Sequence, residues 1–229
     1  MLKIFKNILI FAYRSIIKII FNFLIKEKTF CIISNDCWGA ELYRWMGLEY
    51  NTPFVGLMLM APCYMKFLKN PEKYISAQLE FIPKSQYEEP NNIINKVGYY
   101  PIGQLLDIEI HFLHYKSEDE AFKKWNRRKM KINWDNLFIK FAIDKDYAEQ
   151  THLDEFERLP YQRKVCFSKF DHAEKEICVK VNRFSENGKL LFKNCMREFD
   201  IISWINKGTI HFYGIRKLLG MFLYYSINY

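Results

Sequence analysis

The fold class of this chain is decided by the stretch Thr29-Phe-Cys-Ile-Ile-Ser-Asn-Asp-Cys-Trp-Gly39. It opens with a short apolar run, residues 29–33, that includes two isoleucines. Fully apolar runs of this length are typical of a central strand in an α/β sheet. A helical pattern then begins at Ala40 and stops at Gly47. The succession of strand and helix predicts an α/β fold, with a mostly parallel or mixed central sheet flanked by helices.

The polar loop between this strand and helix is the first candidate for a ligand site. Ligands of α/β sheets bind beyond the carboxyl ends of strands, where free N–H groups and the helix dipole favour an anion. The sequence contains neither Gly-x-Gly-x-x-Gly nor a Walker lysine motif, so a conventional dinucleotide or P-loop site is not expected. The alternative is that residues 34–36 only cap the helix. The substrate-binding candidates in this region are Asn35, Asp36, Trp38 and Arg44.

The second candidate is the run Asp107-Ile-Glu-Ile-His-Phe-Leu-His-Tyr115, which alternates with the period of a strand. One face carries Ile108, Ile110 and Phe112, and the other carries Asp107, Glu109, His111 and Leu113. Several ionisable groups on one face are costly to bury unless they pair, bind a metal or take part in catalysis.

We therefore predict that Asp107, Glu109 and His111 are catalytic, with His111 as the base. Two carboxylates and an imidazole could also hold a divalent cation as a cofactor. His114 falls on the opposite face of a regular strand and is assigned a structural role. The alternative is a surface strand whose acids pair with the lysines and arginines that follow it.

A basic helix follows, and then another strand. The pattern Ser117-Glu-Asp-Glu120 is a capping box that begins the helix. Trp125 and Arg128 share one helix face, an arrangement that suits a sugar ring beside a phosphate. The alternative is a solvated helix face. The further substrate-binding candidates are Trp125, Arg127, Arg128, Asp135 and Asn136.

Residues 1–28 are predicted to form a basic amphipathic helix. Its polar side carries Lys3, Lys6, Asn7, Arg14, Lys18 and Asn22, and its other positions are largely apolar and aromatic. Lysine interrupts the helix too often for a span, which needs about 20 predominantly apolar residues. A helix of this composition fits an anionic membrane surface instead. The alternative is a helix that packs on its own domain, with its lysines in solvent.

Charge and cysteine usage narrow the class of protein. The net charge is +8, and five positive charges precede the first acid, Glu27, which leaves +3 for the rest of the chain. This balance predicts no nucleic-acid partner. None of the six cysteines forms a Cys-x-x-Cys pair, so we expect free thiols in a reducing, cytoplasmic environment.

No Pro/Gly/Ser-rich linker divides the chain. We expect one α/β domain over residues 29–208 and a basic, then aromatic, tail over residues 209–229. A surface loop is expected over residues 84–92. Further strands are predicted at residues 54–57, 78–82, 107–115, 132–141, 163–168 and 176–181.

Two stretches carry a family resemblance, IISNDCWGAELYRWMGLEYNTPFVGLMLMAPCYMKFLKN over residues 32–70 and YYPIGQLLDIEIHFLHYKSEDEAFKKWNRRKMKINWDNLFIKF over residues 99–141. They resemble a bacterial family known as domain of unknown function 1919, whose members are often labelled exopolysaccharide biosynthesis proteins. The resemblance covers roughly residues 29–208. It implies an α/β domain and a cytoplasmic role near surface-polysaccharide assembly, and it supplies no catalytic residues.

These patterns predict a transferase that is peripheral on the inner face of the cell membrane. It would build or modify a cell-surface glycan or exopolysaccharide with a nucleotide sugar or another phosphorylated donor. The donor phosphate would be held by Arg44, Arg127 or Arg128, and the metal or substrate by Asp36 or Asp107. Sugars would stack on Trp38 and Trp125. Two alternatives stay open: a non-catalytic glycan-binding or assembly-complex protein, and a metal-dependent hydrolase.

Overall fold

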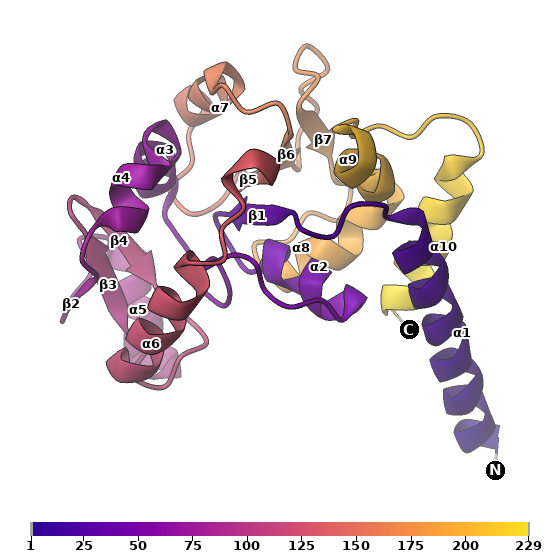
Figure 1. Ribbon diagram of the computed structural model, residues 1–229, viewed down its shortest axis with the longest axis horizontal. Coiled ribbons are helices and arrows are strands. Elements are labelled where there is room, and N and C mark those ends of the chain that lie inside the picture. Colours follow the sequence, from indigo (N-terminus) through magenta and orange to yellow (C-terminus); the bar gives the residue numbers. More distant parts are fainter. Residues whose placement is uncertain (1, 229) are drawn as a thin grey trace.

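The computed structural model describes the backbone of residues 2–228, and the side chains of that range except residues 2–4, 6, 7, 9, 10, 93, 95–97, 227 and 228. Its helices are α1 (Leu2–Leu24), α2 (Trp38–Met46), α3 (Ala61–Lys69), α4 (Pro71–Ser76), α5 (Glu88–Val97), α6 (Glu118–Lys129), α7 (Gln150–Arg158), α8 (Gly188–Asn194), α9 (Ile201–Lys207) and α10 (Arg216–Asn228). Short 3-10 helices are η1 (Trp134–Asn136) and η2 (Cys195–Arg197). The strands are β1 (Cys31–Ser34), β2 (Glu80–Ile82), β3 (Ile102–Leu105), β4 (Ile108–His111), β5 (Leu137–Ala142), β6 (Lys164–Ser168) and β7 (Cys178–Lys180) (Figure 1).

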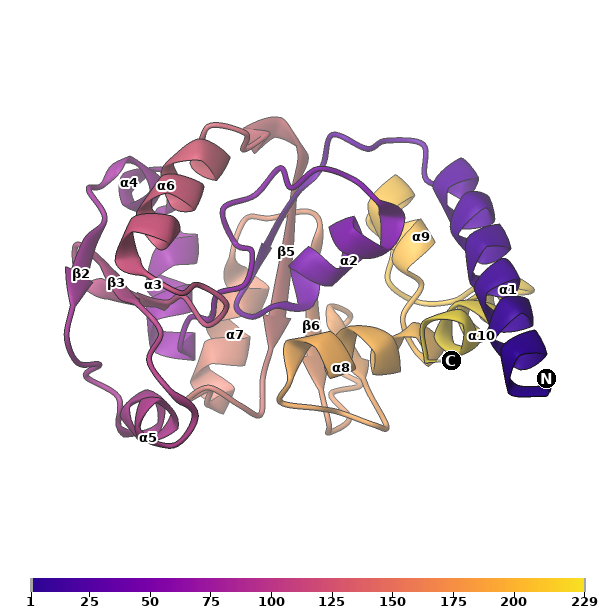
Figure 2. The same cartoon turned by 90° about the horizontal axis from the view of Figure 1, so that it is seen from below.

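The central sheet consists of parallel strands in the order β1-β5-β6-β7, which confirms the predicted α/β class. A smaller antiparallel sheet has the order β2-β3-β4. Figure 2 shows the small sheet and α3–α6 to one side of the central sheet, α2, α8 and α9 to the other, and α1 and α10 outermost. Side chains alternate along β5 to fill both cores: Ile139 and Phe141 face the small sheet, and Phe138 and Ala142 face α2 and α9.

Strand β1 lies at an edge of the central sheet, so its expected central position was wrong. All its residues are nevertheless buried. The Tyr43 hydroxyl lies against the strand, where it accepts a hydrogen bond from the Ile32 N–H at 3.0 Å and donates one to the Phe30 carbonyl at 2.9 Å. A fully apolar strand can therefore stand at an edge, because α2 covers the backbone groups that the sheet leaves unpaired.

The run 107–115 is a strand only as far as His111. Leu106 has φ 56° and forms with Asp107 the tight turn between β3 and β4. After His111 the chain turns again, and the His114 N–H donates to the Gly56 carbonyl at 3.1 Å. Strand alternation therefore cannot assign a face to His114.

Three other local predictions have clear outcomes. The Ser117 hydroxyl accepts from the Glu120 N–H at 3.2 Å, which confirms the helix start there. Residues 54–57 form no strand; next to them Met58 makes only an isolated bridge to His111. The expected loop over residues 84–92 contains the start of α5, whose first turn accommodates Pro90.

The N-terminal helix α1 packs on the domain along one side and exposes apolar side chains along another. Phe21 is buried in the core, whereas Phe11, Ile19 and Phe23 are exposed. Arg14 and Lys18 lie within the described side chains, and the predicted positions of Lys3, Lys6 and Asn7 lie outside them. None of the helices described over residues 2–228 has the length and apolar character needed to cross a membrane.

Candidate functional site

A buried cluster of charges lies at the carboxyl ends of β1 and β5. The two strands pair in parallel with Ser34 opposite Lys140, so the carboxyl ends of both strands lie at the same end of the sheet. The Lys140 Nζ is 2.8 Å from Asp36 Oδ1, and the Lys145 Nζ is 3.0 Å from Asp36 Oδ2. Lys145 also lies 3.1 Å from Asp146. Two lysines thus hold both oxygens of one buried carboxylate.

The neighbouring loops fix this cluster in place. The Asn35 Oδ1 accepts hydrogen bonds from the Lys140 ammonium at 3.3 Å and from the Ala142 N–H at 3.0 Å. The Asp36 Oδ1 accepts from the Trp38 N–H at 3.0 Å, so Asp36 also caps α2, as the capping alternative predicts. The Lys145 ammonium donates a further bond to the Glu186 carbonyl at 2.6 Å.

The loop after β5 has an unusual backbone. Asp144, Asp146 and Tyr147 all have positive φ, at 72°, 54° and 61°. Non-glycine residues in this region are uncommon and cost on the order of 1–3 kcal/mol each when strained. This conformation places Lys145 and Asp146 beside Asp36, so the charge cluster and the backbone strain occupy the same loop.

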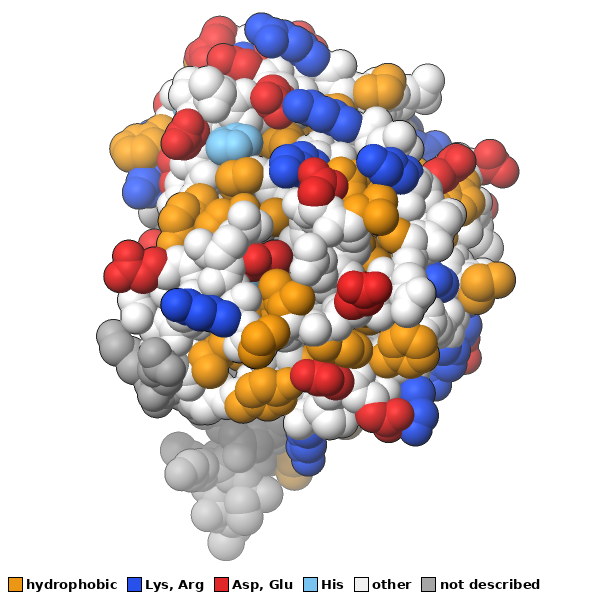
Figure 3. All heavy atoms as spheres, turned by 90° about the vertical axis from the view of Figure 1, so that its left-hand side faces the viewer, with side chains coloured by type: hydrophobic (Ala, Val, Ile, Leu, Met, Phe, Trp, Pro, Cys, Tyr) orange, Lys and Arg blue, Asp and Glu red, His pale blue; other side chains and the backbone are white. Residues whose placement is uncertain are grey.

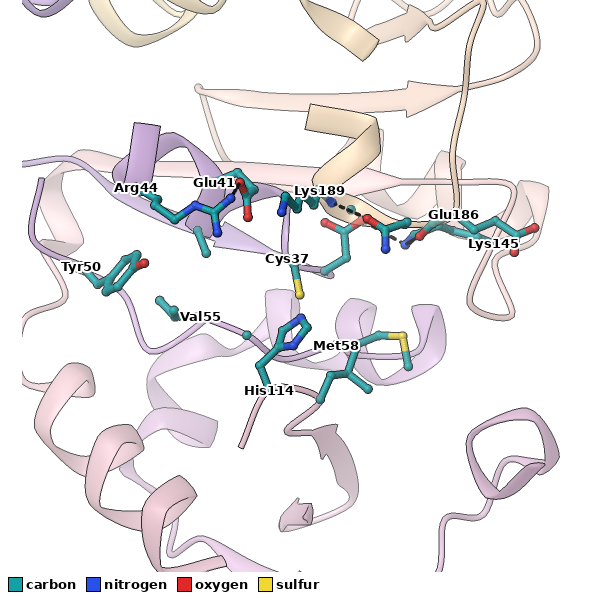
Figure 4. Close-up of a pocket in the computed structure, with 16 residues that line it drawn as sticks. Cys37, Glu41, Arg44, Tyr50, Val55, Met58, His114, Lys145, Glu186 and Lys189 are labelled. Carbon is teal, nitrogen blue, oxygen red and sulfur yellow. Dashed lines mark hydrogen bonds and ion pairs between the residues drawn. The ribbon is translucent and has the colours of Figure 1, made fainter. Parts of the chain in front are cut away.

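A cavity of about 510 Å³ opens beside this cluster; we call it the Asp36 pocket. Its lining comes from the loop after β1, α2, residues 50–58, the turn after β4, the loop after β5 and the start of α8. Figure 4 shows the Cys37 thiol and the His114 ring pointing toward one another, with Arg44 and Glu41 at one side and Lys145 and Glu186 at the other. The lining residues are Asp36, Cys37, Ala40, Glu41, Arg44, Tyr50, Val55, Gly56, Met58, Leu113, His114, Lys145, Glu186, Asn187, Gly188 and Lys189.

Two glycines are needed for the walls to approach this closely. A Cβ at position 188 would lie 2.9 Å from the Asp36 Cγ and 3.0 Å from the Cys37 nitrogen. At Gly56, φ is +70° and a Cβ would lie 3.1 Å from the His114 Cβ. Any side chain at position 188 would therefore displace the carboxylate or the start of α2.

The charges of the cluster set its protonation. Burial alone would raise the pKa of Asp36, but the ammonium groups of Lys140 and Lys145 lower that pKa well below its ordinary value. Burial also lowers the pKa of Lys145, and here Asp36 and Asp146 outweigh it, so that pKa is raised. Asp36 is consequently a carboxylate, and Lys145 an ammonium, throughout the physiological pH range.

The thiol of Cys37 is not activated. Burial and the nearby Asp36 carboxylate raise the pKa of Cys37 to about 12. A reactive cysteine has a lowered pKa, since the thiolate is the nucleophile. Cys37 is therefore a protonated wall of the pocket.

Three of the first four substrate-binding candidates are at this site, although only two reach the cavity. Asp36 lines the Asp36 pocket, and Arg44 stands at its rim with 57% of its side chain exposed and an ion pair of 2.5 Å to Glu41. Asn35 lies outside the cavity lining and accepts a hydrogen bond from Lys140. Trp38 was assigned wrongly, because its ring is fully buried against Phe167 and Trp204 and can stack on no sugar.

The candidates of the basic helix lie away from the cavity. Trp125 is buried in the core beside Phe54, so the proposed stacking surface is wrong. Arg128 is also buried: it donates to the Tyr115 hydroxyl at 2.7 Å and lies over the Tyr50 ring at 5.1 Å, where it supports the pocket from behind. Arg127 is exposed and lines none of the pockets described.

Asp135 and Asn136 lie at the amino end of β5, in η1. This is the opposite end of the parallel sheet from Asp36. Asp135 is exposed, and Asn136 accepts a hydrogen bond from the Arg163 guanidinium. The two residues therefore do not share a site with Asp36.

The predicted catalytic set is separated by the structure. Glu109 and His111 lie together, with the His111 Nε2 3.5 Å from the Glu109 Oε2. Asp107 points away into solvent, where it pairs with Lys66 at 3.0 Å and accepts from the Tyr74 hydroxyl at 2.9 Å. The alternative of a strand with paired acids describes Asp107, except that its partner precedes it in the sequence.

Glu109 and His111 are buried within the small sheet. Glu109 accepts from the Ser85 hydroxyl at 2.6 Å and from the Gln86 N–H at 2.8 Å, and these bonds tie the loop before α5 to β4. His111 is fully buried beside Tyr100 and lines none of the described cavities. Over the outer face of this part of the molecule, acidic, basic and hydrophobic side chains are intermixed (Figure 3). Among the described residues, no three His, Cys, Asp or Glu side chains are arranged to hold a metal ion.

Three residues of the Asp36 site were not predicted. His114 was assigned a structural role, and Lys140 and Lys145 were not singled out. A signal for Lys140 was available, since a lysine interrupts an otherwise apolar strand that pairs on both sides in the central sheet. The position of Lys145 depends on the positive-φ loop, which the sequence pattern does not reveal.

Fold and cavity together define an α/β protein with a pocket, lined by both charged and apolar side chains, beyond the carboxyl end of its first strand, the place where such sheets bind ligands. The family profile for the Domain of unknown function (DUF1919) matches residues 9–206, and the chain belongs to this family. It is also similar to an uncharacterized protein of Haemophilus influenzae, with 30% identity over 184 residues. That similarity covers 76% of this chain and 83% of the relative.

Proposed function

We propose that this protein is a membrane-associated transferase that moves a group from an activated phosphorylated donor, such as a nucleotide sugar, to a cell-surface glycan or its precursor. The observation that carries the proposal is the Asp36 pocket, where a fixed carboxylate, a buried ammonium and an exposed imidazole surround one cavity. The exopolysaccharide label often given to this family supplies the substrate class.

The donor phosphate is assigned to the cationic side of the pocket. Arg44 and Lys189 stand at the rim, and the amino end of α2 faces the cavity at Cys37. Guanidinium and ammonium groups form strong charge-assisted hydrogen bonds with phosphate, and a helix amino terminus favours the same charge. Cations aimed at a leaving phosphate also stabilise the negative charge that develops during transfer.

The acceptor is assigned to the part of the pocket that carries His114. Asp36 is buried and both its oxygens face lysines, so its charge fixes Lys145 in the wall of the cavity, while Tyr50, Val55 and Met58 offer apolar contact to a sugar ring. His114 is exposed in the cavity and can take the proton of an attacking hydroxyl. The base role that the sequence suggested for His111 is therefore transferred to His114.

A divalent cation fits poorly at Asp36. Both oxygens of its carboxylate already face lysine ammonium groups, so a metal would have to displace Lys140 or Lys145. We propose that lysine charge takes the part that a metal plays in other transferases.

Isothermal titration calorimetry with a panel of nucleotide sugars and sugar phosphates tests the proposal. One donor class is expected to bind the full chain, and Lys189→Gln is expected to weaken that binding by roughly tenfold, since it removes a bond to a charged group. Lys84→Gln is the matched control, because Lys84 is exposed and lies outside the pocket. Equal affinities for the two variants, or no binding of any donor, would overturn the proposal. Binding of oligosaccharide alone would favour the glycan-binding alternative, and binding of a divalent metal alone would favour the hydrolase.

A further inference from the structure

A second cavity, of about 550 Å³, adjoins the Asp36 pocket on the side of α1. The two cavities share Glu41, Arg44 and Lys189 in their linings, so they are neighbours across the rim. The second cavity, which we call the α1 pocket, is built from α1, α2, α8 and α10. Its lining residues are Phe11, Arg14, Ser15, Lys18, Glu41, Arg44, Trp45, Lys189, Phe192, Lys193 and Ser226.

The α1 pocket is strongly cationic. It contains five basic side chains and one carboxylate, and that carboxylate pairs with Arg44. Within the described part of the chain, the other four basic side chains form no ion pair; they are Arg14, Lys18, Lys189 and Lys193. Like charges gathered around one hollow repel one another, and an anion in the hollow relieves that repulsion.

The surface next to the α1 pocket is apolar. Along its outer side α1 exposes Ile16, Ile19 and Phe23, at 55%, 68% and 85%. Beyond that side, α1, α9 and α10 form a groove of about 290 Å³. Its lining is Tyr13, Ile16, Ile17, Ile20, Phe21, Leu24, Ile202, Leu219, Phe222 and Leu223. Figure 1 shows α1 and α10 side by side at the end of the molecule, where such a surface is free to lie on a flat partner.

We infer that the α1 pocket binds the phosphate headgroup of a membrane lipid, while the outer side of α1 and α10 rests in the bilayer. A cationic hollow that adjoins an exposed apolar helix face matches an anionic headgroup joined to acyl or prenyl chains. A free phosphate would satisfy the cations and leave the apolar face uncovered. Resting on the proposed function, the inference also names the acceptor class: a lipid-linked phosphate, presented across the shared rim to the Asp36 pocket.

Flotation with vesicles tests the headgroup site. The full chain is mixed with vesicles of phosphatidylcholine alone, or with added phosphatidic acid. We expect binding to the vesicles that contain phosphatidic acid, and we expect Arg14→Gln/Lys193→Gln to lower the partition coefficient by roughly tenfold or more. The control Lys84→Gln/Lys180→Gln removes the same charge from exposed positions outside the pocket and is expected to change it by less than about twofold.

Three results would overturn the inference. The first is an equal loss of vesicle binding in the two double variants, and the second is equal binding to vesicles without phosphatidic acid. The third is displacement of the protein from the vesicles by inorganic phosphate at the concentration at which phosphate binds the protein without vesicles. The folding of each variant is checked by its thermal midpoint.

The test separates this inference from the proposed function. Arg14 and Lys193 line the α1 pocket and not the Asp36 pocket, so donor binding measured without vesicles is expected to be unchanged in Arg14→Gln/Lys193→Gln. Loss of vesicle binding with intact donor binding supports the headgroup site. If vesicle binding depends on Arg14 and Lys193 but the protein binds no donor, the headgroup site is supported and the proposed transferase function is contradicted.

Discussion

His111 and His114 lie close together in the chain, at the end of β4 and in the turn after it, and their surroundings differ. His111 is fully buried beside Glu109, which fastens the loop before α5 to the small sheet. His114 is exposed in a cavity that also contains Asp36 and Lys145. The first environment suits a structural contact, and the second suits chemistry on a ligand. A histidine beside a carboxylate is therefore not enough to define a site; access from solvent decides.

The largest expected effect separates the two histidines by activity. His114→Ala is expected to lower the rate of group transfer by roughly 10²–10⁴-fold, the usual contribution of a general base. Its thermal midpoint is expected to stay near the wild-type value, because the side chain is exposed. His111→Ala is the matched variant: it is expected to lower stability while the folded protein keeps its turnover. Transfer that depends on His111 and not on His114 would reverse the assignment.

The next effect concerns stability and distinguishes Asp36 from the carboxylates of the small sheet. Asp36→Leu leaves Lys140 and Lys145 buried, with Asp146, the partner of Lys145, as the remaining carboxylate. Removal of one partner of a buried ion pair costs about 3–5 kcal/mol, since an uncompensated charge remains. Urea unfolding of the full chain measures this loss. A cost below about 1 kcal/mol would show that the cluster is not a fixed element of the fold.

The pH dependence of stability also distinguishes Asp36 from Glu109, a carboxylate of the small sheet. The folded pKa of Asp36 is lowered, so its contribution to stability is complete above the ordinary pKa of an aspartate, about 3.9, and is lost as the pH falls below it. Glu109 behaves in the same sense: burial raises its pKa, but the adjacent His111 imidazole and the hydrogen bonds from Ser85 and Gln86 outweigh burial and lower that pKa. Asp36→Asn is expected to flatten the acid limb of the stability curve more than Glu109→Gln. The reverse order in urea titrations at several pH values would contradict the electrostatic account.

The smallest effect is expected at Asp107. Its ion pair with Lys66 is exposed, with 56% of the Asp107 side chain accessible. Exposed pairs contribute about 0–1 kcal/mol, so Asp107→Asn is expected to change the free energy of unfolding by less than about 1 kcal/mol and to leave transfer unchanged. A large loss of transfer in this variant would restore the catalytic set predicted from the strand.

The sequence predicted the elements that depend on local patterns. The apolar run at residues 29–33, the helix start at Ser117 and the strand at residues 163–168 all correspond to observed elements, because hydrophobic period and capping chemistry act over a few residues. The edge position of β1 was not predictable, since it depends on the tyrosine of α2 that satisfies the open backbone groups. Tertiary contacts decided that feature.

The candidate site was predicted in one half. Asn35 and Asp36 were expected at the end of an apolar strand, and that rule holds for parallel sheets in general. The histidine of the site was predicted wrongly as His111 and not His114, because strand alternation was extended past His111 into a turn. The lysine partners of Asp36 come from residues more than 100 positions later, through the parallel pairing of β1 with β5 and a loop with positive φ. Neither feature has a short-range signal.

A crystal structure of the full chain with a bound nucleotide sugar would show whether the donor binds in the Asp36 pocket. We expect electron density for the phosphates near Arg44 and Lys189, with the sugar within hydrogen-bond distance of His114. Density beside Asp107, or a ligand that reaches Glu109 and His111 while the Asp36 pocket is empty, would contradict it.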